Sequence, residues 1–315
     1  MKQIIDPHLH FFELTQGHYQ WLKEEEAPFW SDKAKLRHNF HEKSLLLDQY
    51  VELTGFVHIE AGFDNAKPWR EIEWLESSCS LPFRTVAGID LTLKKDAFIA
   101  QVQQLKSYQS VVGCRHILDD EAFELLSQKS VQDNLAYLAE SQLSFDLQMS
   151  LSDKVAVSLL LEILANLPTL RLIINHAGWP PFSSDASFDT EDVLFKKKWQ
   201  EWQTGLIAFS KLEQCAIKCS GWEMAARDYQ ESWQFWVIAD CIKAFGDKRV
   251  MLASNFPLVL FSKEYSELWQ SYLNIGLKVE STPTGEQALT LNEEQVTALT
   301  CANAAYWYKL KVKPI

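Results

Sequence analysis

The first ten residues place an acid and two histidines at every second position. In the stretch Met-Lys-Gln-Ile-Ile-Asp-Pro-His-Leu-His, these residues are Asp6, His8 and His10. If the stretch is a strand, side chains alternate across it and all three groups project from one face. Two imidazoles at this spacing can bind one divalent ion together, or hydrogen-bond a carbonyl oxygen without a metal. For such a pair taken alone, the alternative is two exposed histidines near a terminus.

Further side chains that can bind or transform a polar substrate occur at the ends of later apolar segments. They are His58, Glu60, Asp90, Arg115, His116, Gln148, His176, Lys218, Ser220 and Asn255. In a barrel of parallel strands, the carboxyl ends of all strands meet at one mouth. The sequence therefore predicts that these residues gather with His8 and His10 at a single site.

The elements that must position these residues alternate between strands and helices. Strands are predicted at residues 1–10, 54–61, 84–91, 110–118, 144–149, 170–177, 215–220 and 249–255. Helices are predicted at 41–53, 68–78, 94–107, 121–128, 131–142, 153–166, 191–211, 229–245, 263–275 and 292–309, with a polar loop at 278–291. Eight strands with helices between them predict an α/β fold, a (β/α)8 TIM barrel formed by residues 1–315 as a single domain.

The composition excludes some classes of partner. The chain has 315 residues, 47% of them hydrophobic, and 30 basic against 42 acidic residues give a net charge of −12. A large core can therefore form, and a basic surface for nucleic acid or anionic lipid is not expected. The 12 tryptophans suggest either ordinary core packing or aromatic surfaces around a pocket or a subunit contact, which would allow a homodimer.

Cysteine usage and apolar segments favour a cytoplasmic protein. The six cysteines include no C-x-x-C pair, so we expect them to be reduced and mostly buried. No basic and apolar leader precedes the first strand, so a signal peptide is not supported. The longest apolar stretch, Val155 to Leu167, is interrupted by polar residues and is too short to span a bilayer. We therefore expect a small-molecule substrate, with no membrane partner.

The segment from Phe11 to Asn39 follows the first strand and has little clean periodicity. It is rich in aromatic and acidic residues, including Trp21 and Trp30. A long loop directly after an active-site strand is suited to cover a bound substrate. The alternative is a surface insertion that contains some helix.

With these residues in place, the chain resembles the amidohydrolase-related barrel family, in the branch that includes L-fuconolactonase-like and L-rhamnono-lactonase-like sugar-acid lactonases and 2-pyrone-4,6-dicarboxylate lactonase. The resemblance covers nearly the whole length. Its carriers are D-P-H-L-H at 6–10, V-G-C-R-H at 112–116, I-N-H-A-G-W-P at 174–180, K-C-S-G at 218–221, A-S-N-F-P at 253–257 and N-A-A-Y at 303–306. The resemblance implies hydrolysis of a cyclic ester, with His8, His10 and His176 as metal-binding or substrate-polarising residues.

Two positions depart from the family pattern. The family commonly has Asp where this chain has Asn255, although Asn also occurs in this branch, and a neutral amide is a poor base and a poor metal ligand. Gln148 replaces the histidine or modified lysine of binuclear members. A two-metal site is therefore not expected. One zinc held by the three histidines, and a metal-free site, both remain open.

The remaining roles are assigned as hypotheses. Asn255 and Asp6 are catalytic candidates, and the base is sought among Asp6, Glu60, Asp90 and Asp146. Substrate contacts are expected from Glu60, Arg115, His116, Gln148 and Lys218. Three alternatives stay open: Arg115 pairs with Glu60 or Asp90, His116 is a core histidine, and Lys218 pairs with an acid.

Two other functions remain as alternatives to a lactonase. The first is a metal-dependent decarboxylase of the same family, which would require a firmly held metal and a carboxylate at position 255. The second is a barrel that binds a metabolite without chemistry, its base lost at Asn255.

Overall fold

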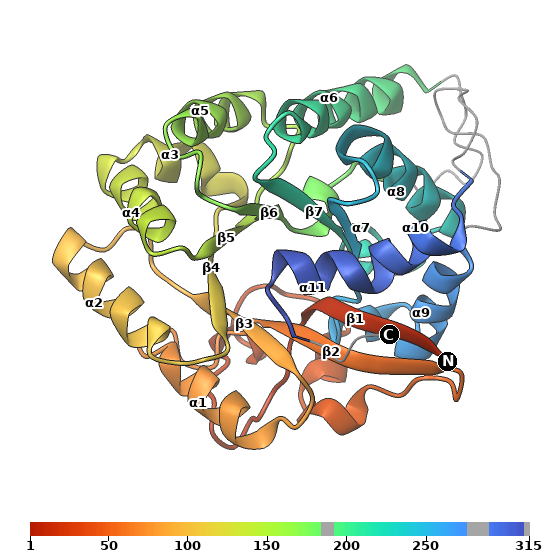
Figure 1. Cartoon of the computed structure of the whole chain (residues 1–315), viewed down its shortest axis with the longest axis horizontal. Coiled ribbons are helices and arrows are strands. Elements are labelled where there is room, and N and C mark those ends of the chain that lie inside the picture. The colour runs from red at the N-terminus through yellow and green to blue at the C-terminus, as the bar shows by residue number, and fades with distance from the viewer. Residues whose placement is uncertain (184–191, 276–289, 312–315) are drawn as a thin grey trace.

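The computed structural model describes residues 1–183, 192–275 and 290–311. Eight strands form one parallel sheet in chain order (Figure 1). They are β1 (Lys2–Leu9), β2 (Val51–Ile59), β3 (Phe83–Gly88), β4 (Val111–Ile117), β5 (Ser144–Gln148), β6 (Leu172–Ile174), β7 (Cys215–Cys219) and β8 (Val250–Leu252). The predicted order of strands is confirmed, while β6 and β8 are shorter than predicted.

The sheet closes on itself where β8 leads back to β1. Leu9 forms a parallel bridge with Phe256. The backbone N–H of Asn255 donates to the carbonyl of His8 at 2.9 Å, and the N–H of His10 donates to Phe256 at 2.6 Å. The predicted (β/α)8 barrel is thus confirmed, and its closure brings residues 8–10 beside residues 255–256.

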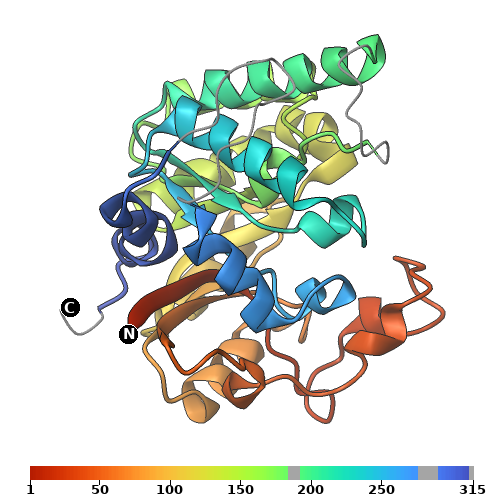
Figure 2. The same cartoon turned by 90° about the vertical axis from the view of Figure 1, so that its right-hand side faces the viewer.

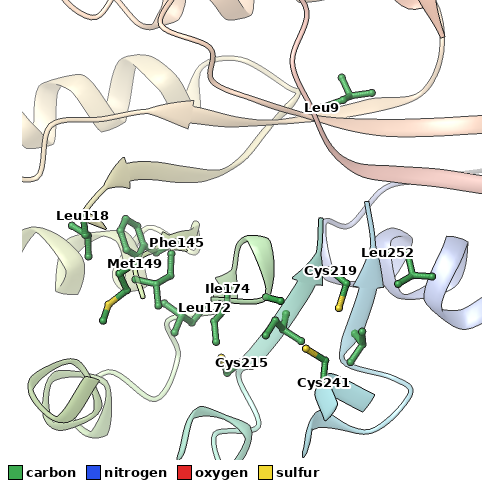
Figure 3. Packing of buried hydrophobic residues seen from close by; sticks show 14 of the residues in the cluster. Leu9, Leu118, Phe145, Met149, Leu172, Ile174, Cys215, Cys219, Cys241 and Leu252 are labelled. Carbon is green, nitrogen blue, oxygen red and sulfur yellow. The ribbon is translucent and has the colours of Figure 1, made fainter. Parts of the chain in front are cut away.

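Helices surround the barrel between successive strands (Figure 1). They are α1 (Trp69–Ser78), α2 (Lys95–Lys106), α3 (Ala122–Ser127), α4 (Lys129–Glu140), α5 (Lys154–Ala165), α6 (Val193–Ser210), α7 (Trp222–Ala225), α8 (Glu231–Phe245) and α9 (Tyr265–Leu273). Buried apolar side chains fill the space between strands and helices, as Figure 3 shows for Phe145, Leu172 and Cys241. This packing fixes the strands and therefore the side chains at their ends.

The inside of the barrel is filled separately. Strand residues such as Ile5, Val57 and Met251 form a second apolar cluster with Trp307 and Tyr308 from the end of the chain. These last residues belong to a continuous helical segment, α10 (Glu293–Thr297), a π-helical turn (Ala298–Ala302) and α11 (Asn303–Trp307). In Figure 2 this segment and the segment after β1 lie on opposite sides of the barrel. The C-terminal helices therefore close the end remote from the mouth.

The helix predicted at residues 41–53 is wrong. His41 caps a 3-10 helix of three residues (Glu42–Ser44), and β2 begins at Val51, which pairs with Lys2. The need to extend the parallel ladder with β1 outweighs the helical pattern of this segment. Most of the predicted loop at 278–291 lies outside the described residues. Among the described residues, no helix is long and apolar enough to cross a membrane.

Candidate active site

An irregularity in β1 decides which of its polar side chains enters the barrel. Asp6 pairs with Phe56 and Leu9 pairs with His58, so three steps along β1 match two along β2. Such a bulge changes the side on which later residues project. Asp6 and the two histidines therefore do not share one face, which corrects the expectation from simple alternation.

The Asp6 carboxyl is bonded to the barrel wall. It accepts hydrogen bonds from the Ser254 hydroxyl and N–H, from the His8 N–H and from the Tyr265 hydroxyl at 3.2 Å. Burial raises its pKa to about 6, although these bonds lower it in part. Asp6 is not among the residues that line the cavity described below. Its geometry suits fixing β1 against β8, and the structure gives it no path to a substrate.

Three imidazoles meet at the mouth. The ring centroids of His8 and His10 are 5.1 Å apart, and those of His8 and His176 are 4.6 Å apart. His10 Nδ1 bonds the Ile59 carbonyl at 2.8 Å, and His176 Nδ1 contacts the Ser220 hydroxyl at 3.1 Å. The closed barrel thus brings together the histidines that the sequence singled out.

All three imidazoles are held in the neutral form. Burial is the largest cause and lowers the pKa of His10 to about 4 and the pKa values of His8 and His176 well below the usual range. The positive charges of Arg115 and Lys218 lower them further. Neutral imidazole can bind a metal through one nitrogen or donate a hydrogen bond from it, according to the tautomer.

A tight turn presents His176. The residue has a φ of 53°, and its ring stacks on Trp179 with centroids 4.8 Å apart. On the other side lies Gly221, where an added Cβ would come within 2.5 Å of His176 Nδ1. The K-C-S-G stretch therefore ends in glycine because the imidazole occupies the space of a side chain.

Lys218 lies beneath His8 and not in the cavity wall. Its Nζ is 2.6 Å from Asp146 Oδ2 and 3.3 Å from His8 Nδ1, and both partners of the ion pair are fully buried. The Tyr308 hydroxyl also donates to Asp146 Oδ2, at 2.7 Å. Burial lowers the Lys218 pKa to about 8, opposed by Asp146. The alternative that Lys218 pairs with an acid is therefore found, and Asp146 is not available as a base.

Arg115 is also engaged within the protein. Its Nε donates to Glu60 Oε1 at 2.9 Å, its Nη2 to the Glu60 carbonyl at 2.8 Å and its Nη1 to Gln148 Oε1 at 3.1 Å. Burial alone would raise the Glu60 pKa, but the adjacent guanidinium gives a net lowering. The structure thus shows the ion pair with Glu60, one of the two alternatives for Arg115.

Two further residues predicted for the site, Asp90 and His116, both line the cavity. Asp90 is half-buried rather than buried, and its Oδ1 accepts hydrogen bonds from the Thr92 N–H and hydroxyl. His116 Nδ1 lies 3.1 Å from both the Ile89 carbonyl and the Leu91 nitrogen. The ring of His116 is therefore satisfied by backbone, as expected for the structural alternative.

Behind Asn255 lies a buried acid that sequence reasoning missed. Glu223 is 1% exposed, and its Oε1 accepts a hydrogen bond from Asn255 Nδ2 at 2.5 Å. Glu223 Oε2 and Asn255 Oδ1 are both buried without a hydrogen-bond partner among the described residues. Burial raises the Glu223 pKa to about 7, partly offset by Asn255. Asn255 lines the cavity, and its hydrogen bond to the Glu223 carboxyl fixes the orientation of its side-chain amide.

We expect Glu223 to make stability depend on pH. Its pKa rises from 4.5 to about 7 on folding, so its contribution is full below pH 4.5 and is lost as pH rises through 7. The variant Glu223→Gln lacks this loss. The difference in free energy of unfolding between this variant and the native chain should therefore shift in favour of the variant by on the order of 3 kcal/mol between pH 4.5 and pH 8, as measured by urea unfolding. The matched change Glu140→Gln, at an exposed site, should show no such gain. An equal response of both variants would contradict the assignment.

Two further acids of the site were missed. Asp119 has a φ of 35° and joins two walls, because it accepts hydrogen bonds from Gln148 Nε2 at 3.1 Å and Trp179 Nε1 at 3.0 Å. Glu71 on α1 is 3% exposed and accepts the Ala61 N–H. Both lie in or beside helical patterns, where an acid is usually solvated, so their sequence context gave no signal.

These side chains surround a cavity of about 860 Å³. Its lining includes His10, His176, Arg115, Gln148 and Asn255, whereas His8 lies directly behind the wall. The segment after β1 contributes Trp21, Pro28 and Trp30 to the lining. The expectation that this segment covers the site therefore agrees with its position.

The donor set fits the chemistry of a divalent metal. Imidazole nitrogen is a preferred zinc ligand, and metal-bound histidines commonly have their second nitrogen held by a hydrogen bond. His8 Nε2 is buried without a partner, and Nδ1 of each histidine has one. Within residues 1–183, 192–275 and 290–311, however, no group of three or more His, Cys, Asp or Glu side chains is arranged to hold an ion. The side chains that zinc prefers are therefore present, but in the described residues they are not arranged as a metal-binding cluster.

The family assignment agrees with this architecture. A model of the amidohydrolase family matches residues 5–310, so the chain belongs to the amidohydrolase family. An uncharacterised protein of Sinorhizobium fredii, y4mH, is 24% identical over 285 residues, which cover 86% of this chain and 91% of that protein. The resemblance predicted from the motifs is thereby confirmed at the level of the family.

Solved structures show the same fold. An amidohydrolase from Burkholderia multivorans with bound zinc has a TM-score of 0.75 at 18% identity, over 98% of this chain and 100% of that chain. A candidate 2-pyrone-4,6-dicarboxylic acid hydrolase from Pseudomonas putida has a TM-score of 0.63 at 16% identity, over 99% and 100%. At these identities the similarity establishes the barrel fold, within a family of hydrolases and lyases.

Proposed function

We propose that the protein hydrolyses a small lactone, a sugar-acid lactone or a related cyclic ester, at the histidine-lined wall of the cavity. The observation that carries this proposal is the meeting of three buried imidazoles beside a cavity of about 860 Å³. Ester hydrolysis requires groups that stabilise the negative charge developing on the carbonyl oxygen. Imidazole N–H groups in a largely buried wall are suited to that task.

The His8 tautomer distinguishes two versions of this mechanism. If the Lys218 ammonium donates to His8 Nδ1, at 3.3 Å, the ring proton lies on Nε2 and His8 acts as a hydrogen-bond donor. If His8 Nδ1 instead donates to Asn175 Oδ1, at 3.2 Å, Nε2 has a free lone pair. The second tautomer suits zinc, which His8, His10 and His176 would hold. Bound zinc would polarise the carbonyl and lower the pKa of water.

The attacking water needs an orienting group and a proton acceptor. Asn255 Oδ1 is buried without a partner in the described residues and would accept a hydrogen bond from this water. An amide cannot take its proton. For this role we propose Asp90, which lines the cavity and accepts hydrogen bonds from the described residues through Oδ1, leaving Oδ2 for the water. The proton then passes to the ring oxygen as the acyl C–O bond breaks, giving the open hydroxy acid.

A screen of lactones tests the proposal. Purified protein is incubated with aldonolactones and muconolactone-like compounds, and acid release is followed with a pH indicator, before and after dialysis against a chelator. We expect acid release from at least one lactone. Release that survives dialysis identifies the metal-free version, and release restored by added zinc identifies the metal version. Tight ligand binding without turnover would instead identify a metabolite-binding barrel. Decarboxylation is disfavoured because position 255 carries an amide.

A further inference from the structure

The lining of the cavity carries more negative than positive charge once its ion pairs are taken into account. Among the described residues that form it there are five carboxyl side chains, one guanidinium and no lysine; they are Glu60, Asp64, Glu71, Asp90, Asp119 and Arg115. Arg115 pairs with Glu60, and Arg70, outside the lining, pairs with Asp64 at 2.8 Å. Burial raises the pKa of Glu71 well above its usual range, so Asp90 and Asp119 remain as carboxylates with no ion pair among the described residues. A site that recognises an anionic substrate needs cations or free N–H groups arranged around the anion. The balance of charge here is the opposite.

The charge of the one guanidinium in this lining is already neutralised by a carboxylate, Glu60, at 2.7 Å. Each of the three guanidinium nitrogens donates a hydrogen bond, two of them to Glu60 and one to Gln148. Gln148 is in turn held by Asp119, through its Nε2 at 3.1 Å. A substrate carboxylate at Arg115 would have to share the guanidinium with Glu60 or displace it, so one of the two carboxylates would lack a full ionic partner in a largely buried wall.

Lys218 does not supply the missing positive charge. It is fully buried, lies outside the cavity lining and is paired with Asp146 at 2.6 Å. The two imidazoles of the lining, His10 and His176, each have Nδ1 bound within the protein, to the Ile59 carbonyl at 2.8 Å and the Ser220 hydroxyl at 3.1 Å. A carboxylate on the substrate would therefore lose its hydration without gaining an ionic partner.

The same lining is well suited to hydroxyl groups. Carboxylate and amide oxygens accept hydrogen bonds from hydroxyls, and indole faces can pack against the C–H faces of a ring. Trp21, Trp30 and Trp179 line the cavity together with these acceptors. Glu71, 3% exposed, bonds the Ala61 N–H through one oxygen, so its carboxyl is held in place beneath the same wall.

We infer that the substrate is an uncharged, polyhydroxylated lactone, and that the Glu60–Arg115 pair excludes lactones that carry a carboxylate. This inference rests on the proposed lactone hydrolysis and specifies its substrate. Glu60 is then a specificity-determining residue: it neutralises Arg115 and contributes a hydroxyl acceptor. Rejection follows from an ion that would be left unpaired, not from the size of the cavity.

A matched pair of substrates tests this inference. The lactone of galactonic acid and the monolactone of galactaric acid have the same ring and differ by a CH2OH group in place of a carboxylate. We expect kcat/KM of the native protein to be about 100-fold higher for the neutral lactone, the ratio typical for one unpaired charged group. Equal or higher kcat/KM for the acidic lactone would overturn the inference while leaving lactone hydrolysis intact.

The variant Glu60→Gln tests the cause. It frees the charge of Arg115, so the preference for the neutral lactone should fall at least about tenfold. Glu71→Gln makes the same carboxyl-to-amide change in the same lining without contact to Arg115, and it should leave the ratio within about twofold. An unchanged ratio in Glu60→Gln would overturn the assigned cause. If neither lactone nor any other in the screen is hydrolysed, both the inference and the proposed function fail.

Discussion

Replacing His176 with alanine should remove lactone hydrolysis and leave the barrel folded. The imidazole lines the cavity and contacts His8, Trp179 and Ser220, so its loss removes one polarising group from the wall. Loss of one such donor typically lowers kcat by about 100- to 1000-fold. The side chain lies on a turn after β6, outside the apolar clusters that hold the strands, so circular dichroism should remain native.

The matched control for this prediction is His18→Ala. The His18 side chain is 65% exposed and does not line the cavity, so that variant should retain the native rate. Kinetics with the best lactone of the screen would provide the comparison. Native kcat/KM in the His176→Ala variant would exclude this histidine from the mechanism, even if the fold and the substrate class were right.

Replacing Lys218 with methionine should destabilise the protein by about 3–5 kcal/mol. The change removes the ammonium group from Asp146, which is fully buried and would keep the Tyr308 hydroxyl as its remaining donor among the described residues. An unpaired carboxylate in the barrel interior has lost its hydration and its counterion together. Urea unfolding at neutral pH should therefore show a clearly lower midpoint with little change in slope.

Two further variants isolate the charge. In Lys218→Met with Asp146→Asn, the remaining side chain is neutral and can still accept the Tyr308 hydrogen bond, so most of the stability should return. Lys129→Met breaks an exposed pair with Asp133, whose side chains are 79% and 54% exposed, and should cost less than about 1 kcal/mol. If the Lys218 single variant matches this surface control, the buried pair contributes no more than an exposed one.

Sequence reasoning predicted the barrel because its signal is repeated eight times. Apolar segments ending in polar residues alternate with amphipathic ones, and small errors at element ends do not alter the order of the strands. The same regularity located His10, Arg115, Gln148, His176 and Asn255, all of which line the cavity. Their common position follows from parallel strands, whose carboxyl ends share one mouth.

The errors arose where a single extra residue or a long-range contact decides the outcome. The bulge between Asp6 and Leu9 reverses the face of the strand from which the later side chains project. The alternation of residue types in the sequence does not reveal it. The contact of Glu223 with Asn255 joins two loops that only barrel closure brings together. Distances of this kind depend on tertiary packing, so the pattern of residue types could not separate Glu223 from solvated acids.

The C-terminal helices, which close the end of the barrel remote from the mouth, have a consequence for synthesis on the ribosome. His8 and His10 leave the exit tunnel long before Phe256, so β1 lacks its closing partner until Phe256 has emerged. Asp146 gains its Tyr308 partner later still, because Tyr308 is translated after β8. Until then the nascent chain exposes the inner faces of its strands, which gives chaperones a long interval in which to bind them.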